Sequence, residues 1–204
     1  EIPLRLVGSE MCIRDRVVSG IGNVEHNSIL VRYSNDFSIW DLESVNHYKD
    51  QSDIFFTCHE FSYNKIAEAY EPYLGLIRQM FHRYCSGTLE EFMEECDVYK
   101  LQRPVFESYF ENGFCERTEQ ILIDEVEYEQ ERMRNSIVTM LQKLSEIRPV
   151  VIVLNRFQLA SKSTMQLTNR LLQTKNKNIG IVLGVNDVQS IPEFAHEEWD
   201  AICE

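Results

Sequence analysis

Two unbroken apolar runs separated by one helical segment constrain the fold more than any other feature of this sequence. The runs are residues 149–154 (PVVIVL) and 179–185 (IGIVLGV), and both are too short for a helix of their own. Runs of this kind, rich in β-branched residues, are typical of strands buried on both faces of a sheet. Between them, residues 163–166 have the spacing of a capping box, which predicts a helix with Ser163 as its N-cap. Strand, helix and strand in this order predict a βαβ unit of a parallel sheet.

Polar residues follow each of the two predicted strands. Asn155 and Arg156 come directly after the first strand, and Asn186 follows the second. The ligands of parallel α/β sheets bind at the carboxyl ends of the strands. We therefore expect Asn155, Arg156 and Asn186 to face a ligand site.

A second candidate for ligand binding lies near the beginning of the chain. Residues 17–19 predict a short strand, residues 20–28 a glycine-containing loop, and residues 29–33 a helix. This is the context in which a phosphate-binding loop occurs, although neither possible register of the motif supplies its lysine, and Glu25 adds a negative charge. The pattern alone favours an ordinary turn. The candidate nucleotide-contacting residues of this loop are Gly20, Gly22, His26, Asn27 and Ser28.

The order of these motifs resembles the STAND class of signal-transduction NTPases, which belongs to the AAA-like P-loop ATPases. In that family an apolar strand preceded by Arg-Pro ends in two acidic residues, and an aromatic-containing loop, a Ser-Thr helix start and a second strand with a polar sensor follow. Residues 148–164 follow this pattern, except that Asn155 and Arg156 replace the acidic pair. The resemblance extends from Val17 to about Gln189. It implies an α/β fold, a three-layer P-loop NTPase-like parallel sheet with helices on both faces, in which residues 179–185 lie between the first strand and residues 149–154.

The same resemblance implies a function, and the replaced residues modify it. In family members the loop lysine and the first acidic residue hold the phosphates and Mg²⁺, while the second acidic residue polarises the attacking water. Because both parts of this machinery are replaced here, we expect a degenerate ATPase-like regulatory or scaffold module, not an enzyme, with no required cofactor. The alternative is a conformational switch that binds ATP or ADP with Mg²⁺ weakly, through Gly20, Gly22 and the following backbone N–H groups, with slow or no hydrolysis.

The resemblance also suggests partners, and the composition limits them. We expect a larger cytoplasmic signalling protein of bacterial type, in which the module contacts helical repeats, an output domain and protein partners. The net charge of −13 disfavours direct binding to nucleic acid. No run of eighteen apolar residues is present, so no membrane partner is expected. The cysteines match no zinc or disulfide spacing, which favours reduced thiols.

The first sixteen residues stand apart from the rest of the chain. Residues 5–16 (RLVGSEMCIRDR) resemble the translation of a sequencing adapter, so we expect residues 1–16 to be artefactual or non-native. A natural N-terminal strand is the other interpretation. Residues 17–204 are then expected to form a single, truncated P-loop NTPase-like domain.

The remaining patterns predict one more strand and several helices. Residues 53–58 predict a strand, and helical spacing begins at Pro72, at Leu89, at Leu101 and at Glu125. The many glutamates along these helices indicate solvent-exposed faces. A catalytic pair of Cys58 and His59 is disfavoured, because neighbouring residues of a strand point to opposite faces. An unrelated α/β enzyme that uses Cys58 or His82 is a third hypothesis.

Overall fold

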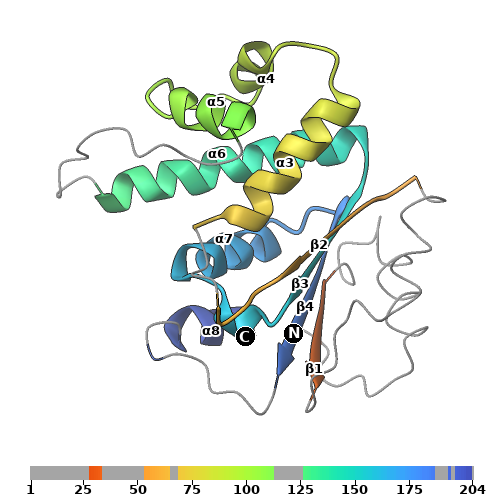
Figure 1. The fold of residues 1–204 in the computed structure, drawn as a ribbon, viewed down its shortest axis with the longest axis vertical. Coiled ribbons are helices and arrows are strands. Elements are labelled where there is room, and N and C mark those ends of the chain that lie inside the picture. The colour runs from red at the N-terminus through yellow and green to blue at the C-terminus, as the bar shows by residue number, and fades with distance from the viewer. Residues whose placement is uncertain are drawn as a thin grey trace. The chain divides into compact units, whose positions relative to one another are not determined.

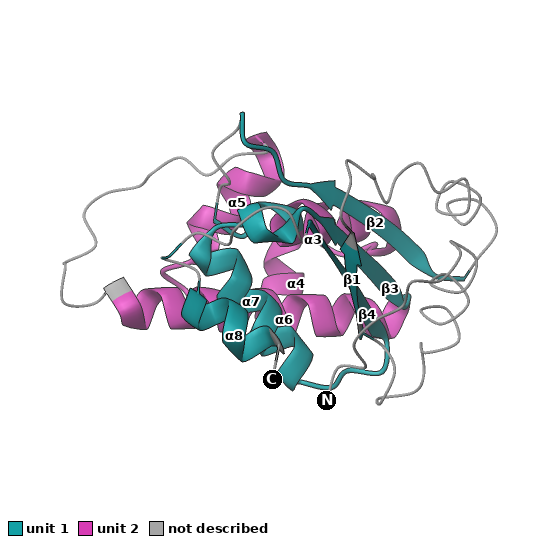
Figure 2. Ribbon diagram, turned by 90° about the horizontal axis from the view of Figure 1, so that it is seen from below, with its two compact units in different colours: residues 1–72, 148–204 teal, residues 73–147 magenta. Residues whose placement is uncertain are grey.

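The computed structural model describes residues 28–33, 53–64, 69–112, 126–186, 193 and 196–203. The chain divides into two compact units (Figure 2). Glu1–Pro72 and Arg148–Glu204 form the first unit, and Tyr73–Ile147 form the second. The first unit therefore consists of two segments that are separate in the sequence.

A four-stranded, wholly parallel sheet forms the centre of the first unit (Figure 1). Its strands are β1 (Ser28–Tyr33), β2 (Phe55–Glu60), β3 (Val150–Asn155) and β4 (Ile179–Asn186), in the order β1-β4-β3-β2. Every residue of β3 and β4 is buried, as their continuous apolar runs predict. The parallel sheet is therefore confirmed. β4 lies between β1 and β3, whereas the predicted place of residues 179–185, between residues 17–19 and residues 149–154, stays a prediction because residues 17–19 lie outside the described residues.

The first strand differs from the prediction. Residues 29–33 were expected to form a helix, and this is wrong, because they belong to β1. The strand pairs with β4 from Ser28 opposite Ile181 to Tyr33 opposite Asn186. β-branched and aromatic residues favour a pleated strand, and β4 supplies its hydrogen-bonding partner. The predicted strand at residues 17–19 lies outside the described residues.

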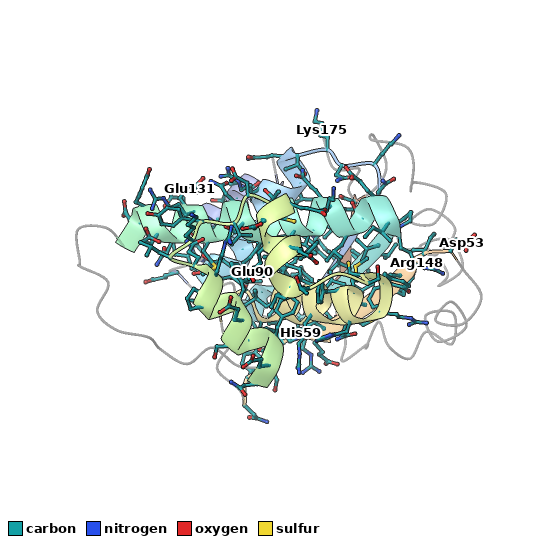
Figure 3. All side chains as sticks on the ribbon, turned by 90° about the horizontal axis from the view of Figure 1, so that it is seen from above. Asp53, His59, Glu90, Glu131, Arg148 and Lys175 are labelled. Atoms are coloured by element: carbon teal, nitrogen blue, oxygen red, sulfur yellow. The ribbon has the colours of Figure 1, made fainter. Side chains whose placement is uncertain are left out.

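The amino ends of β2 and β3 are joined by polar contacts. Phe55 N donates to Pro149 O at 2.7 Å. Beside this bond, Arg148 Nη2 lies 3.9 Å from Asp53 Oδ1 (Figure 3). These contacts lie at the edge of the sheet opposite to the one at which the strands end.

A short 3-10 helix and an α-helix connect β3 to β4. The 3-10 helix η3 spans Phe157–Leu159, and α7 spans Lys162–Gln173. The N-cap of α7 is Ser161, whose Oγ accepts from Thr164 N at 3.3 Å, so the predicted N-cap at Ser163 is wrong. Ser161 has the extended backbone that an N-cap needs, whereas Ser163 is already helical. The last described helix of this unit, α8 (His196–Cys203), packs on α7.

The second unit is helical in its described part. It contains α3 (Glu71–Tyr84, which begins in the first unit), α4 (Leu89–Glu95), α5 (Arg103–Asn112) and α6 (Val126–Ile147), close to the helices that the sequence predicts. Its interior includes a cluster of aromatic rings, in which the Phe81 ring centre lies 5.2 Å from that of Phe92 and 5.5 Å from that of Phe110. No helix in the described part of the chain is long and apolar enough to cross a membrane.

Candidate functional site

The carboxyl ends of the strands bring together three of the predicted site residues. β3 ends at Asn155, Arg156 follows it, and β4 ends at Asn186. In the register of the sheet, Glu60 at the end of β2 stands opposite Asn155. Since this edge is where parallel α/β sheets bind ligands, it is the candidate functional site. The participation of Asn155, Arg156 and Asn186 in nucleotide binding remains a prediction.

Arg156 is held by a carboxylate from the neighbouring strand. Its Nε lies 3.3 Å from Glu60 Oε1, and about a third of each side chain is exposed. The backbone of Arg156 is left-handed, with φ of 53°. Next to it, Phe61 N donates to Asn155 O at 3.1 Å, which continues the pairing of β2 and β3 beyond the last residue of β2. The guanidinium charge at this edge is therefore already partly neutralised within the sheet.

Buried amide groups occupy the ends of β3 and β4. Asn155 is fully buried and Asn186 is 5% exposed. Asn186 N donates to Oε1 of Gln158, a fully buried residue of η3, at 3.4 Å. Amide groups accept and donate hydrogen bonds but bring no net charge to a metal ion or a phosphate. This part of the edge is thus neutral.

A row of aromatic rings crosses the same edge. The ring centre of Phe61 lies 4.6 Å from that of His59 and 6.1 Å from that of Phe157, and Phe157 lies 6.4 Å from Trp199 of α8. Phe61, Phe157 and Trp199 are all buried. The row joins residues at the ends of β2 and β3 to α8. Sequence patterns did not reveal this row, because its members come from three separate segments.

A buried carboxylate connects α8 to the first turns of α7. Oε1 of Glu198 accepts from Lys162 Nζ at 3.1 Å and from Gln166 Nε2 at 2.9 Å. Burial, the largest single effect, raises the pKa of this carboxyl, but the hydrogen bonds from Lys162 and Gln166, a backbone hydrogen bond and the charge of Lys162 together leave the pKa below its usual value. Glu198 is therefore ionised at neutral pH. No local sequence pattern distinguishes Glu198 from the other glutamates of the chain.

Ser28 lies away from the other predicted site residues. It is the first residue of β1 and pairs with Ile181, whereas Asn186 pairs with Tyr33 at the other end of the strand. At about 3.3 Å per residue, roughly 16 Å of strand separate the two ends. The structure therefore does not bring Ser28 to Asn155 and Asn186. Gly20, Gly22, His26 and Asn27 lie outside the described residues.

The position of β1 changes which segment follows the N-terminal strand at the candidate site. The sequence predicts residues 20–28 there, whereas residue 34 is the first to follow β1. Because β1 ends at Tyr33, the chain continues from this edge into residues 34–48. Their sequence, SNDFSIWDLESVNHY, contains no Gly, Lys or Arg, and it contains three acidic residues. Phosphate-binding loops depend on glycines and on a lysine. The fifteen residues that follow β1 therefore lack the glycines and the lysine of such a loop, and the first lysine after β1 is Lys49.

The described part of the chain gives little support to the other chemical hypotheses. Cys58 and His59 are successive residues of β2, as expected. Strand geometry sends their side chains to opposite faces. Among the described residues, no group of three or more His, Cys, Asp and Glu side chains could hold a metal ion.

Comparison of the chain with protein-family models, with curated proteins and with solved structures gives no match. The residues at the carboxyl edge of the sheet are therefore the basis on which a function can be assigned.

Proposed function

We propose that this chain is a degenerate ATPase-like module that serves a larger cytoplasmic signalling protein as a regulatory or scaffold element. It adopts a three-layer P-loop NTPase-like arrangement with helices on both faces of the sheet. It acts through its conformation and through contacts with other domains of the same chain and with protein partners. It requires no cofactor.

The replacement of charge at the end of β3 is the observation that carries this proposal. An ATPase of this type needs carboxylates at this point to hold Mg²⁺ and to polarise water. Asn155 is neutral and fully buried, and Arg156 has the opposite charge. The guanidinium of Arg156 is moreover paired with Glu60 at 3.3 Å and is thus not available as a full charge to a phosphate.

Two further observations support the same conclusion. The strand order β1-β4-β3-β2, all parallel, is compatible with a P-loop NTPase-like sheet, so the fold can be retained without the chemistry. The sequence of residues 34–48, which follows β1, contains no glycine, lysine or arginine. The acidic pair and the lysine of the phosphate-binding loop are thus both missing. We expect this combined loss in a protein that retains the fold in order to bind other domains or proteins through its surface.

One observation favours a weak nucleotide switch as the second candidate. The Arg156–Glu60 pair is about one-third exposed, and pairs of this kind contribute only about 0–1 kcal/mol. A triphosphate could compete with Glu60 for the guanidinium. In that case ATP or ADP would bind weakly, without the carboxylates that hydrolysis needs.

Isothermal titration calorimetry with Mg-ATP and Mg-ADP at millimolar concentration separates the two candidates. The module hypothesis predicts no saturable heat and no phosphate release above the buffer rate. Micromolar affinity that is lost in Arg156→Gln and kept in the control Arg170→Gln, on α7, would establish the switch instead.

A gain-of-function variant tests the degenerate site itself. Asn155→Asp combined with Arg156→Glu restores the acidic pair of the family. We expect no hydrolysis, because the cationic partner of the phosphates is still missing. Turnover in this double variant would mean that the rest of the site is intact, and would contradict the proposal.

A further inference from the structure

The docking of α8 on α7 depends on one buried carboxylate. Glu198, Trp199 and Ile202 are the buried residues of α8, whereas its other described side chains are exposed. Trp199 contacts Phe157 at the carboxyl edge of the sheet. Glu198 is the polar member of this set and receives hydrogen bonds from Lys162 and Gln166 of α7. One charged residue is thus part of an otherwise apolar docking face.

The two partners of this ion pair differ in their exposure to water. The side chain of Glu198 is 8% exposed, and that of Lys162 is 51% exposed. A buried charge that loses its partner is strongly unfavourable, because the desolvated ion is no longer compensated. The buried carboxylate therefore relies on the charge of a lysine that solvent, a modifying enzyme or a competing anion can reach.

The docked state also leaves part of the carboxylate unsatisfied. Both hydrogen bonds from α7 go to Oε1 of Glu198. The other oxygen, Oε2, is buried and has no hydrogen-bond partner among the described residues. A buried acceptor without a donor disfavours the state in which it is buried. The docked arrangement of α8 thus includes a cost that an exposed Glu198 would not have.

We propose that α8 is a releasable latch, and that the positive charge of Lys162 keeps it closed. When that charge is lost, Glu198 moves into water and α8 leaves α7. Trp199 then separates from Phe157, so the aromatic row at the carboxyl edge ends at η3. The latch operates whether or not the module binds a nucleotide, and therefore goes beyond the proposed function.

Hydrogen–deuterium exchange of the full 204-residue chain tests the latch. In Lys162→Gln we expect the amides of α8 to exchange roughly tenfold faster. This factor lies between the small effect of losing an exposed ion pair and the large effect of losing a buried one. The amides of β3 and β4 should keep their protection. Lys177→Gln, an exposed lysine in the turn after α7, and Glu197→Gln, an exposed neighbour on α8, serve as controls and should change nothing.

A second variant separates a latch from a simple loss of contact. Adding Glu198→Leu to Lys162→Gln removes the buried charge, so α8 should regain its slow exchange on an apolar face. Unchanged exchange in Lys162→Gln would overturn the proposal. The proposal would also be overturned if the amides of α8 exchanged as fast in the double variant as in Lys162→Gln. Equal acceleration of exchange in α8, β3 and β4 would overturn it too, because it would show that α8 does not open separately from the sheet.

Discussion

Arg156 forms an ion pair with Glu60 across the ends of two adjacent parallel strands, with 3.3 Å between Nε and Oε1. Glu60 stands opposite Asn155 in the register of the sheet, so the pair crosses from β2 to the residue just after β3. The carboxyl edge thereby combines a positive and a negative charge at the place where the ATPases that the sequence resembles combine two negative ones. A site of this composition has little net charge left for a ligand.

The left-handed backbone of Arg156 gives a prediction about its substitution. With φ of 53°, this position suits glycine better than alanine. Arg156→Gly and Arg156→Ala both remove the ion pair, so their difference isolates the backbone. We expect the glycine variant to be more stable by about 1 kcal/mol, measured by urea unfolding.

The same pair of substitutions in an ordinary helix should give the reverse order. Gln79 is an exposed residue of α3, where alanine should be favoured over glycine by about 1 kcal/mol. If alanine is also the more stable residue at position 156, the left-handed backbone is not retained in solution.

The helix start of α7 gives a second prediction. Ser161 Oγ accepts from Thr164 N and lies 2.9 Å from Thr164 Oγ1, whose oxygen also accepts from Tyr70 N at 3.1 Å. Ser161→Ala should destabilise the protein by about 1 kcal/mol. Ser163→Ala, at the position that the sequence favours, should change the free energy of unfolding by less than about 0.5 kcal/mol. If Ser163→Ala destabilised the protein more than Ser161→Ala in thermal or urea unfolding, Ser163 would be the N-cap, as the sequence predicts.

The strands that the sequence predicted correctly are those with the strongest local pattern. Residues 149–154 and 179–185 are continuous apolar runs, and a run of this kind is buried in any sheet that contains it. Residues 28–33 contain fewer consecutive apolar residues and include the charged Arg32. Their local sequence therefore did not distinguish a helix from a strand. Pairing with β4, far along the chain, decides their structure. Tertiary context therefore outweighed local pattern at β1.

The candidate site was predictable in part. The positions of Asn155, Arg156 and Asn186 follow from the rule that ligands of parallel α/β sheets bind at the carboxyl ends of the strands. The Arg156–Glu60 pair does not, because Glu60 ends β2 and Arg156 follows β3, and no local pattern shows the register of these two strands. The same holds for Glu198, which a single sequence does not distinguish from the exposed glutamates around it.

The centre of β3 gives a third prediction, about stability. Ile152 is fully buried in a strand that pairs on both sides, with β2 and β4. Ile152→Ala removes three carbon atoms from this core and should cost about 2–5 kcal/mol in urea unfolding. Tyr63→Ala, at a side chain that is 62% exposed, should cost less than about 0.5 kcal/mol. Equal losses in the two variants would place Ile152 outside the core.

The ionisation of Glu198 gives a fourth prediction, about pH. Its pKa in the folded protein is lower than its usual value, because the hydrogen bonds from Lys162 and Gln166 favour the carboxylate despite burial. A carboxyl with a lowered pKa stabilises the folded state at pH values above its unfolded pKa of about 4.3. This contribution is lost as the pH falls through that value and then through the lower folded pKa.

Glu198→Gln removes the titrating group and keeps a side chain of similar size. The free energy of unfolding of the unaltered chain should therefore exceed that of Glu198→Gln at neutral pH. The difference should shrink as the pH falls below about 4.3, when Glu198 of the unaltered chain also becomes neutral. Glu197→Gln, at an exposed neighbour on α8, should show a much smaller dependence on pH. Urea unfolding of the three chains from about pH 7 to about pH 3 measures both dependences. A difference that grows in acid would require a raised pKa, and would mean that burial outweighs the two hydrogen bonds to Oε1.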